Sequence, residues 1–277
     1  MTPAARVAFL GPEGTFAHTV ARKRFGARCE LVSRPSIKEV FQWVSSGRRG
    51  LGIVPVENSS GGTIFDTVDC LLEHAGRIFV RESLSLNVKL ALLGRDPERV
   101  RVIYSHFAPL QHCGAWLDEH FPRARRVETP STAQAVQRAV EEEGAAAIGN
   151  KVAAARYRLR VLRYPIETPL PNRTQFFIVG RDRTPAAGAS RMTLLVSLPN
   201  TPGSLCDFLT PFKRHGINLS RILSRAIPGQ PSTYVFLVDV EGTDRQSEVK
   251  RVFAEVRRAR AKVEILGVYP VRRPYTS

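Results

Sequence analysis

Short apolar strands alternate with capped helices over the first 150 residues, and this order constrains the fold more than any other feature. One unit begins with the apolar segment 6–10 and continues through a Gly-containing turn at 11–16 into a helix that Gly26 ends. A capped helix and a second apolar strand follow at 36–55, and a second set of strand–helix units begins at residue 100. Such alternation favours an open α/β sheet, in which ligands bind at the carboxyl ends of the strands.

Polar side chains follow these strands at the edge where ligands bind. The turn at 11–16 leads into a helix start, where free backbone N–H groups and the helix dipole favour an anion. An ordinary tight turn or polar loop would explain each of these segments taken alone, and a lone histidine is usually structural. The candidate residues at the strand ends are Thr15, Glu57, Asn58, Ser59, Ser105, His106, Ser131 and Thr132.

A further strand is expected within 169–180, late in the first domain, where an apolar run follows a proline-containing loop. In an extended strand, alternate side chains face opposite ways. Thr174 and Phe176 therefore share one face, and Arg173 and Gln175 share the other. An edge strand with a solvated arginine and glutamine is the alternative interpretation.

The chain is expected to form two domains, because its 277 residues exceed what one hydrophobic core usually serves. An alternating extended run at 78–94 can carry the chain from one lobe of the first domain into the other. After a linker rich in Pro, Ala and Gly, a β-α-β-β-α-β order predicts a four-stranded antiparallel sheet with two helices on one face. The expected ranges are about 1–80 and 165–181 for lobe 1, about 81–164 for lobe 2, 182–190 for the linker and 191–277 for the second domain.

The formal net charge of +16 invites a nucleic-acid interpretation. The arginines are spread over both halves, however, with no long basic run, helix-turn-helix signature or RNA-binding aromatic motif. A basic protein also raises the local concentration of small anions. We therefore expect a small acid as the ligand and no nucleic-acid partner.

No apolar run approaches the roughly 20 residues that a membrane-spanning helix needs, and residues 1–6 lack the apolar segment of a signal peptide. We expect a cytoplasmic protein with no membrane partner. The four cysteines form no C-x-x-C pair and have no histidine at a zinc-site spacing, so they are expected to be buried, reduced, structural and free of metal.

Five motifs, taken together, resemble the signature set of the prephenate dehydratases, in this order and at these intervals. They are Gly11–Phe16, Pro55–Ser59, Ser105-His106 with Cys113, Ser131-Thr132, and Asn172-x-Thr174-x-Phe176. Segments 200–205 and 215–219 are similar to the ACT regulatory domain of such enzymes, so the resemblance covers nearly the whole chain. It implies an α/β catalytic domain of two lobes, like periplasmic ligand-binding proteins, with substrate in the cleft, and a ferredoxin-like βαββαβ ACT domain.

The resemblance implies that prephenate loses carbon dioxide and its ring hydroxyl to give phenylpyruvate, in phenylalanine biosynthesis and without a cofactor. Thr174 matches the threonine regarded as essential in the family. A hydroxyl donor there would help the hydroxide leave, while other donors hold the two carboxylates. The implied substrate-binding residues are Thr15, Glu57, Asn58, Ser59, Ser105, His106, Ser131, Thr132, Asn172, Arg173, Gln175 and Phe176.

The ACT domain implies that phenylalanine inhibits by binding at an interface between subunits, in a homodimer or homotetramer. The start of the first ACT helix and the asparagine just past its end would frame this pocket in a side-by-side dimer. The implied effector residues are Gly203, Ser204, Leu205, Asn218, Leu223, Ser224 and Arg225.

Three places depart from the family's pattern. Gln175 replaces the arginine beside the catalytic threonine, which predicts a cost of about ten- to hundredfold in rate or affinity unless Arg173 substitutes for it. Segment 107–113 lacks the usual Pro-Gln-Ala beginning. Leu223 and Ala226 replace a glutamate and a proline of the ACT motif, so phenylalanine inhibition is expected to be weak or moderate.

Three other functions stay open at this point. Gln175 favours a relative that decarboxylates prephenate without aromatising it, whereas the retained Thr174 argues against that reaction. The substrate could also be arogenate, the amino analogue of prephenate. A non-catalytic sensor of a small acid would need an output module, and every segment is already assigned to one of the two domains.

Overall fold

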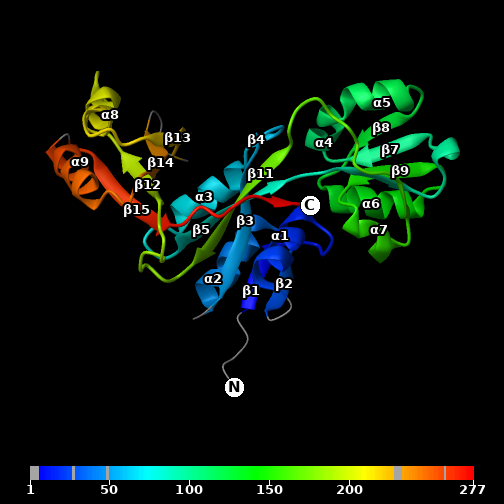
Figure 1. Cartoon of the computed structure of the whole chain (residues 1–277), viewed down its shortest axis with the longest axis horizontal. Coiled ribbons are helices and arrows are strands. Elements are labelled where there is room, and N and C mark those ends of the chain that lie inside the picture. Colours follow the sequence, from blue (N-terminus) through cyan, green and yellow to red (C-terminus); the bar gives the residue numbers. More distant parts are fainter. Residues whose placement is uncertain (1–5, 27–28, 48–49, 228–232, 259) are drawn as a thin grey trace.

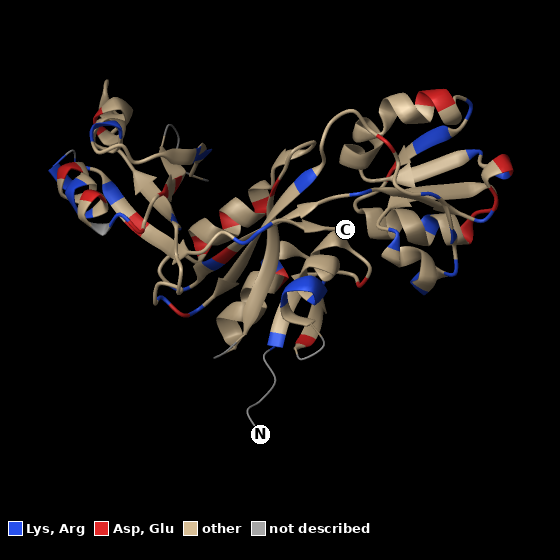
Figure 2. Cartoon of the chain, in the orientation of Figure 1, with Lys and Arg blue, Asp and Glu red and all other residues tan. Residues whose placement is uncertain are grey.

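Three bodies lie in a row in the computed structural model (Figure 1), which describes residues 6–26, 29–47, 50–227, 233–258 and 260–277. The first lobe lies in the middle, between the second lobe and the C-terminal domain. Residues 1–5, part of the segment in which the sequence predicts no signal peptide, lie outside the described residues. Of the helices described, none has the length and apolar character to cross a membrane. Lysine and arginine are distributed over all three bodies (Figure 2).

The first lobe contains a seven-stranded sheet in the order β16-β5-β11-β3-β1-β2, with β4 paired to β3. The α/β pattern is confirmed, since β1 pairs in parallel with both β2 and β3, and β11 lies antiparallel between β3 and β5. The strands are β1 (Arg6–Leu10), β2 (Glu30–Arg34), β3 (Leu51–Asn58), β4 (Gly62–Thr63), β5 (Phe79–Asn87), β11 (Arg173–Gly180) and β16 (Tyr275–Thr276). The helices are α1 (Phe16–Phe25), α2 (Ile37–Ser46) and α3 (Phe65–Glu73).

Alternation along β11 separates two hydrophobic cores, one on each face of this sheet. Phe176 and Ile178 belong to the core shared with α1 and the second lobe. Phe177 and Val179 belong to the core shared with α2, α3 and the C-terminal domain. Side chains at even positions of β11 therefore face the second lobe, and those at odd positions face the C-terminal domain.

The second lobe contains a five-stranded sheet in the order β10-β6-β9-β7-β8. Its strands are β6 (Ala91–Gly94), β7 (Val102–Ser105), β8 (Arg125–Glu128), β9 (Ala145–Gly149) and β10 (Arg160–Arg163). Its helices are η2 (Pro97–Arg99), α4 (Phe107–His112), α5 (Gly114–His120), α6 (Thr132–Glu141) and α7 (Val152–Tyr157). The helical segment that follows β7 is divided at Cys113 into α4 and α5, and α7 and β10 were not predicted. Because β5 stays in the first sheet up to Asn87, the chain crosses between lobes after that residue rather than near residue 80.

The C-terminal domain has the predicted βαββαβ order, with a four-stranded antiparallel sheet in the order β13-β14-β12-β15. Its elements are β12 (Arg191–Ser197), α8 (Ser204–Arg214), β13 (Leu219–Ala226), β14 (Tyr234–Glu241), α9 (Gln246–Arg258) and β15 (Lys262–Tyr269). Both helices cover one face, where Phe208 and Val252 share a core with Leu194. The other face packs on the first lobe. There a Cβ on Gly267 would lie 2.2 Å from Val80 O, so glycine allows this close crossing.

The C-terminal tail differs from the prediction that 191–277 form one domain. After β15 the chain returns to the first lobe, where Tyr275 pairs in parallel with Leu86 and Thr276 with Asn87. Tyr275 also packs against the core of that lobe. A strand of two residues is too short to show hydrophobic periodicity, so this return could not be predicted from the sequence pattern.

Candidate active site

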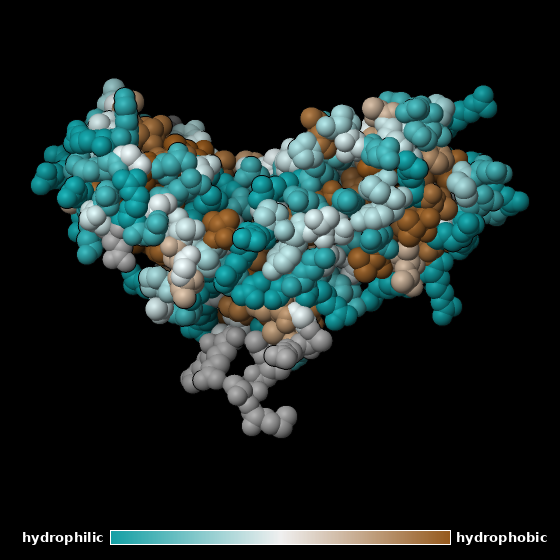
Figure 3. Space-filling model, in the orientation of Figure 1, coloured by the Kyte–Doolittle hydropathy of each residue, from teal (hydrophilic) through white to brown (hydrophobic). Residues whose placement is uncertain are grey.

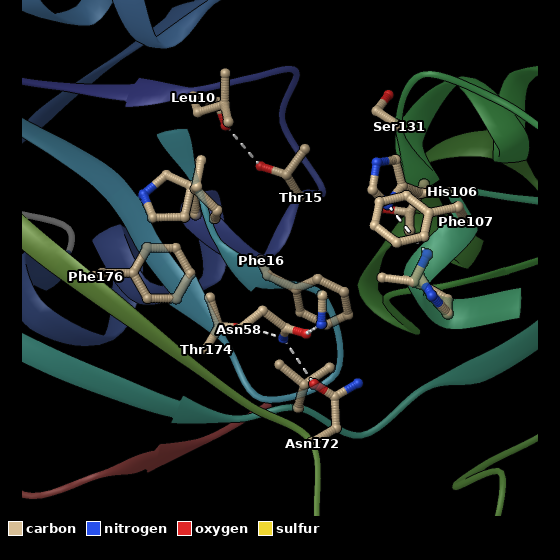
Figure 4. A pocket seen from close by; sticks show the side chains of 18 of the residues that line it. Leu10, Thr15, Phe16, Asn58, His106, Phe107, Ser131, Asn172, Thr174 and Phe176 are labelled. Atoms are coloured by element: carbon tan, nitrogen blue, oxygen red, sulfur yellow. Dashed lines mark hydrogen bonds between the residues drawn. The ribbon is translucent and has the colours of Figure 1, made fainter. Parts of the chain in front are cut away.

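A cavity of about 420 Å³ lies between the two lobes, within the usual size range of small-molecule sites (Figure 4). The first lobe contributes the ends of β3 and β11 and the start of α1, and the second lobe contributes the starts of α4 and α6. Eight residues predicted from the sequence line it, namely Thr15, Asn58, His106, Ser131, Thr132, Asn172, Thr174 and Phe176. The strand-end argument therefore brings most of the predicted side chains to one place.

Asn58 holds the hydroxyl of Thr174 in a defined orientation. Asn58 Oδ1 accepts hydrogen bonds from the backbone N–H groups of Ser60 and Gly61, each at 2.9 Å. This fixes which end of the amide faces Thr174, since Nδ2 must then point the other way. Asn58 Nδ2 donates to Thr174 Oγ1 at 2.8 Å and to Asn172 Oδ1 at 2.9 Å. Thr174 Oγ1 is thus an acceptor toward Asn58, and its own proton points elsewhere.

Two helices from opposite lobes direct their N-terminal ends at the cavity. Thr15 caps α1 by accepting from His18 N at 3.2 Å, and Ser131 caps α6 by accepting from Gln134 N at 3.2 Å. Each helix carries ten residues, so each has a partial positive charge at this end. The arrangement favours two negatively charged groups, one on each side of the cleft.

His106 caps α4 from the second lobe and also faces the cavity. Its Nδ1 atom accepts from Ala108 N at 3.4 Å, which leaves the proton of the neutral ring on Nε2. Burial lowers the pKa of His106 below its usual value of 6.5, and nearby Glu128 opposes this shift. The neutral imidazole can therefore donate one hydrogen bond into the cleft.

Aromatic and aliphatic side chains complete the cavity wall and were not predicted as site residues. Phe16 enters from the first lobe next to Asn58, and Phe107 enters from the second lobe next to His106 (Figure 4). The signal that could have found them is their position, since each directly follows a predicted motif residue. Other apolar lining residues are Leu10, Pro55, Ile64, Val88, Leu90 and Pro130.

His112 was also missed, although it connects the lobes beside the cavity. Its Nδ1 lies 2.9 Å from Ser60 Oγ in the first lobe, and its Nε2 lies 2.8 Å from Thr168 Oγ1. Thr168 Oγ1 donates its proton to Leu170 O, so it accepts from Nε2–H, and Nδ1 accepts from Ser60. Burial lowers the pKa of His112 below 6.5, which favours this neutral form.

Five predicted substrate-binding residues do not line the cavity, so direct contact with substrate does not fit their positions. Ser59 Oγ donates to Pro171 O, and Ser105 Oγ is buried against Ile148 O. Arg173 Nη2 donates to Ser85 Oγ on the opposite face of β11.

The other two residues outside the cavity lining, Glu57 and Gln175, face the C-terminal domain. The alternation predicted along this strand is correct, but the sequence did not show which face meets the cleft. Because neither Gln175 nor Arg173 lines the cavity, the predicted loss from a missing cation has no direct basis in this geometry.

The predicted effector residues fall into two groups in the C-terminal domain. Ser204 and Leu205 line a second cavity of about 430 Å³, and Gly203 precedes them with φ +85°, a backbone conformation that suits glycine. The others lie elsewhere: Asn218 donates to Glu241, Leu223 packs against the core shared with the first lobe, Ser224 is exposed, and Arg225 binds Asp69 of α3. In the described part of the chain, no group of three or more His, Cys, Asp or Glu side chains could hold a metal ion.

Comparison with known proteins supports the resemblance seen in the motifs. The prephenate dehydratase family model matches residues 7–184, and the ACT domain model matches residues 192–258. A bifunctional chorismate mutase/prephenate dehydratase of Pseudomonas aeruginosa is 37% identical over 267 residues, which cover 96% of this chain and 73% of that protein.

Two solved structures are similar to the whole chain. One is a prephenate dehydratase of Arthrobacter aurescens in complex with L-Phe, at 28% identity and a TM-score of 0.85, with 96% of this chain and 90% of that chain covered. The other is GqqA, described as a quorum quenching acylase, at 26% identity and a TM-score of 0.84, with 96% and 98% covered. The two family models together match most of the described residues, and the chain therefore belongs to the prephenate dehydratase family, with an ACT domain after its catalytic region.

Proposed function

We propose that this prephenate dehydratase eliminates carbon dioxide and the ring hydroxyl of prephenate in the cleft between the lobes, with Thr174 as the hydrogen-bond donor to the leaving oxygen. The observation that carries this assignment is the 2.8 Å hydrogen bond from Asn58 Nδ2 to Thr174 Oγ1. It occupies a lone pair of the hydroxyl and leaves its proton available to the cavity. Phenylpyruvate is the product.

The reaction needs assistance mainly at the leaving oxygen. The electrons of the breaking bond to carbon dioxide enter the ring, which becomes aromatic as the carbon–oxygen bond breaks. The departing hydroxide is stabilised by the Thr174 O–H group and takes up a proton from solvent to leave as water. A donor positioned where negative charge develops lowers the barrier through its hydrogen bond. The threonine does not have to transfer its proton completely.

The two carboxylates of prephenate match the two capped helix ends. We assign one to the start of α1 near Thr15 and the other to the start of α6 near Ser131, where backbone N–H groups and the helix dipoles favour anions. His106 Nε2–H supplies a further donor. Phe16 and Phe107 provide the apolar walls that a ring becoming aromatic would contact.

Phenylalanine is proposed as the effector of the ACT domain, as the Arthrobacter aurescens complex with L-Phe suggests. Ser204 and Leu205 line the second cavity, which is the candidate half-site. Exposed Leu205, Ile222 and Tyr234 lie in the region of α8, β13 and β14, where Figure 3 shows hydrophobic side chains. We propose that this surface joins subunits into the dimer or tetramer expected from the sequence, in a cytoplasmic enzyme.

The alternatives differ in how much supports them. The non-aromatising decarboxylase was motivated by Gln175, and that motivation weakens because Gln175 lies outside the cavity lining. The interpretation as a non-catalytic sensor does not explain why Asn58 orients the hydroxyl of Thr174. Arogenate remains an alternative substrate that differs from prephenate in a single side-chain group.

A second activity, amide hydrolysis, is favoured by two hydrogen bonds of His112. Ser60, His112 and Thr168 form a hydrogen-bonded series that resembles a nucleophile, a base and an orienting group. Ser60 is not part of the cavity lining, so dehydration is the better supported function. Hydrolysis of an N-acyl amide that is abolished in Ser60→Ala would establish this second activity, and no hydrolysis by the parent would exclude it.

Product identification tests the proposed function. The purified protein should be incubated separately with prephenate and with arogenate in the presence of a metal chelator, and the products identified by mass spectrometry. We expect phenylpyruvate from prephenate, and faster turnover of prephenate than of arogenate. A decarboxylated product that keeps the ring hydroxyl would contradict the assignment.

A further inference from the structure

Arg221 of the ACT domain binds the two strands that carry Asn58 and Thr174. Its Nη2 atom donates hydrogen bonds to Glu57 Oε2 at 2.6 Å and to Gln175 Oε1 at 2.5 Å. The arginine side chain is only 13% exposed, whereas that of Glu57 is 47% exposed, so the contact with Gln175 is the more shielded of the two. One residue of the regulatory domain therefore holds both strands of the catalytic lobe at once.

The two residues that Arg221 binds lie directly beside the catalytic pair. Gln175 pairs across the ladder with Glu57, and the adjacent pair on the same strands is Thr174 with Asn58. The ladder has a bulge immediately beyond the Gln175–Glu57 pair. The bulge separates the last two β3–β11 pairs from the regular part of that ladder, and Arg221 adds a contact that joins the two strands beyond it. On its other edge β11 pairs with β5 through the same residues without a break.

The guanidinium is in turn fixed inside the ACT domain. Arg221 Nη1 lies 3.4 Å from Asp239 Oδ2, whose side chain is 1% exposed, and Asp239 Oδ1 accepts from Thr193 Oγ1 at 2.6 Å. Toward the first lobe, Arg221 Cζ lies 5.8 Å from the centre of the Phe177 ring of β11. Burial raises the pKa of Asp239, and the positive charge of Arg221 opposes this shift. The packing of the ACT sheet thereby sets where the guanidinium lies.

We propose that Arg221 is a positioning residue for the dehydration, because it clamps the ends of β3 and β11 and so fixes Asn58 and Thr174 from the ACT domain. The proposal rests on the proposed function of this cleft. It also gives the route by which a ligand of the ACT domain reaches the reaction: a shift of the ACT sheet moves the guanidinium, and the strand ends follow. Since a misplacement of about 1 Å can cost on the order of hundredfold in rate, loosening the clamp acts mainly on kcat.

Substitution of Arg221 tests the clamp. Arg221→Met keeps the unbranched stem of the side chain but removes the guanidinium group and both hydrogen bonds, and we expect kcat to fall by about ten- to hundredfold with KM changed by no more than about twofold. Arg221→Lys keeps a positive charge beside Asp239 and a donor toward Glu57, and should restore most of the lost kcat. The matched control is Asp69→Asn, which removes the ion pair with Arg225 across the same domain interface. This control should keep kcat within about twofold of the parent.

Hydrogen exchange provides a readout that needs no substrate. Amides in segments 55–60 and 172–177 should exchange faster in Arg221→Met than in the parent, and at the parent rate in Asp69→Asn. If Arg221→Met does not fold, the double variant Glu57→Met with Gln175→Met removes both acceptors without altering the ACT interior, and should show the same changes. A parent that makes no phenylpyruvate would contradict the proposed function. The role of Arg221 would be overturned if its variant and the double variant left both amide exchange and kcat unchanged. It would also be overturned if Asp69→Asn changed exchange and kcat to the same extent.

Discussion

Thr174 and Gln175 are neighbours on β11, yet their side chains lie on opposite faces of the sheet. One faces the cleft between the lobes, and the other faces the ACT domain. Thr174 Oγ1 lies in the cleft, 2.8 Å from Asn58 Nδ2, whereas Gln175 Oε1 lies 2.5 Å from Arg221 Nη2 of the ACT domain. The position where the sequence shows a glutamine in place of the family's arginine is therefore a domain-interface position in this chain. Its chemistry concerns how the domains are joined and not how substrate is held.

Restoring the arginine of the family is expected to bring no gain. In Gln175→Arg, two guanidinium groups would meet where a hydrogen bond now exists, so we expect a lower Tm and no increase in kcat. Gln175→Met is the matched variant, which loses the hydrogen bond without adding a charge, and it should lower Tm less. Thermal unfolding and steady-state kinetics measure both effects. A kcat raised by about tenfold in Gln175→Arg would show that a cation at this position serves the reaction.

Asn58→Asp separates two roles of Asn58. An aspartate can still accept from the N–H groups of Ser60 and Gly61, but it has no N–H to donate to Thr174. The threonine hydroxyl would then donate its hydrogen bond to the carboxylate, and this proton would no longer be available to the leaving oxygen of the substrate. We expect kcat to fall by about 10²-fold or more while Tm stays close to that of the parent. Retention of full activity by Asn58→Asp would mean that the orientation of Thr174 is set by another group.

The bridge through His112 predicts a dependence of stability on pH. Its pKa in the folded protein is lowered from 6.5, so the stability it contributes is present above about pH 6.5 and is lost as the pH falls through the folded pKa. His112→Gln keeps a donor for Thr168 and an acceptor for Ser60 but does not titrate. Between about pH 7.5 and about pH 5.5, the variant should lose less Tm than the parent. His106 and His18 also have lowered pKa values and remain in both proteins, so an equal loss in both would assign the dependence to them.

Phenylalanine should bind the ACT domain without help from position 223. Leu223 packs against the core shared with the first lobe and does not line the second cavity, so Leu223→Glu would bring a carboxylate toward that core. We expect this variant to have a lower Tm and no stronger binding of phenylalanine. Isothermal titration calorimetry measures the affinity, and binding to the parent should also raise its Tm by mass action. No heat of binding to the parent at millimolar phenylalanine would mean that the ACT domain has another ligand or none.

Much of the site could be predicted because its signals are local. Ser36 and Ser131 cap the helices that their sequence patterns indicate. The polar residues at the end of β3 and before α6 each lie at the carboxyl edge of their own lobe's sheet, and both line the cavity between the lobes. The sequence also predicted that the side chains of Thr174 and Gln175 lie on opposite faces, since this follows from the two-residue period of a strand.

Contacts between distant segments had no such signal. Arg221 lies 164 positions from Glu57, and nothing in the composition of either segment indicates that they meet. His112 connects the lobes through two hydroxyl groups that any polar loop could offer. Which face of β11 meets the cleft depended on where the second lobe and the ACT domain pack, and tertiary packing alone decided that Gln175 faces away from substrate.

The turnover of Thr174→Ala tests the central claim most directly. The side chain is 8% exposed and gives up only its hydrogen bond with Asn58 when truncated, so the fold should persist with a nearly unchanged Tm. We predict that kcat for conversion of prephenate to phenylpyruvate falls by about 10²–10⁴-fold, the range for loss of an acid–base group, while Thr174→Ser keeps most of the activity. A Thr174→Ala enzyme that turns over as fast as the parent would contradict the account and make His106 the next candidate for the donor.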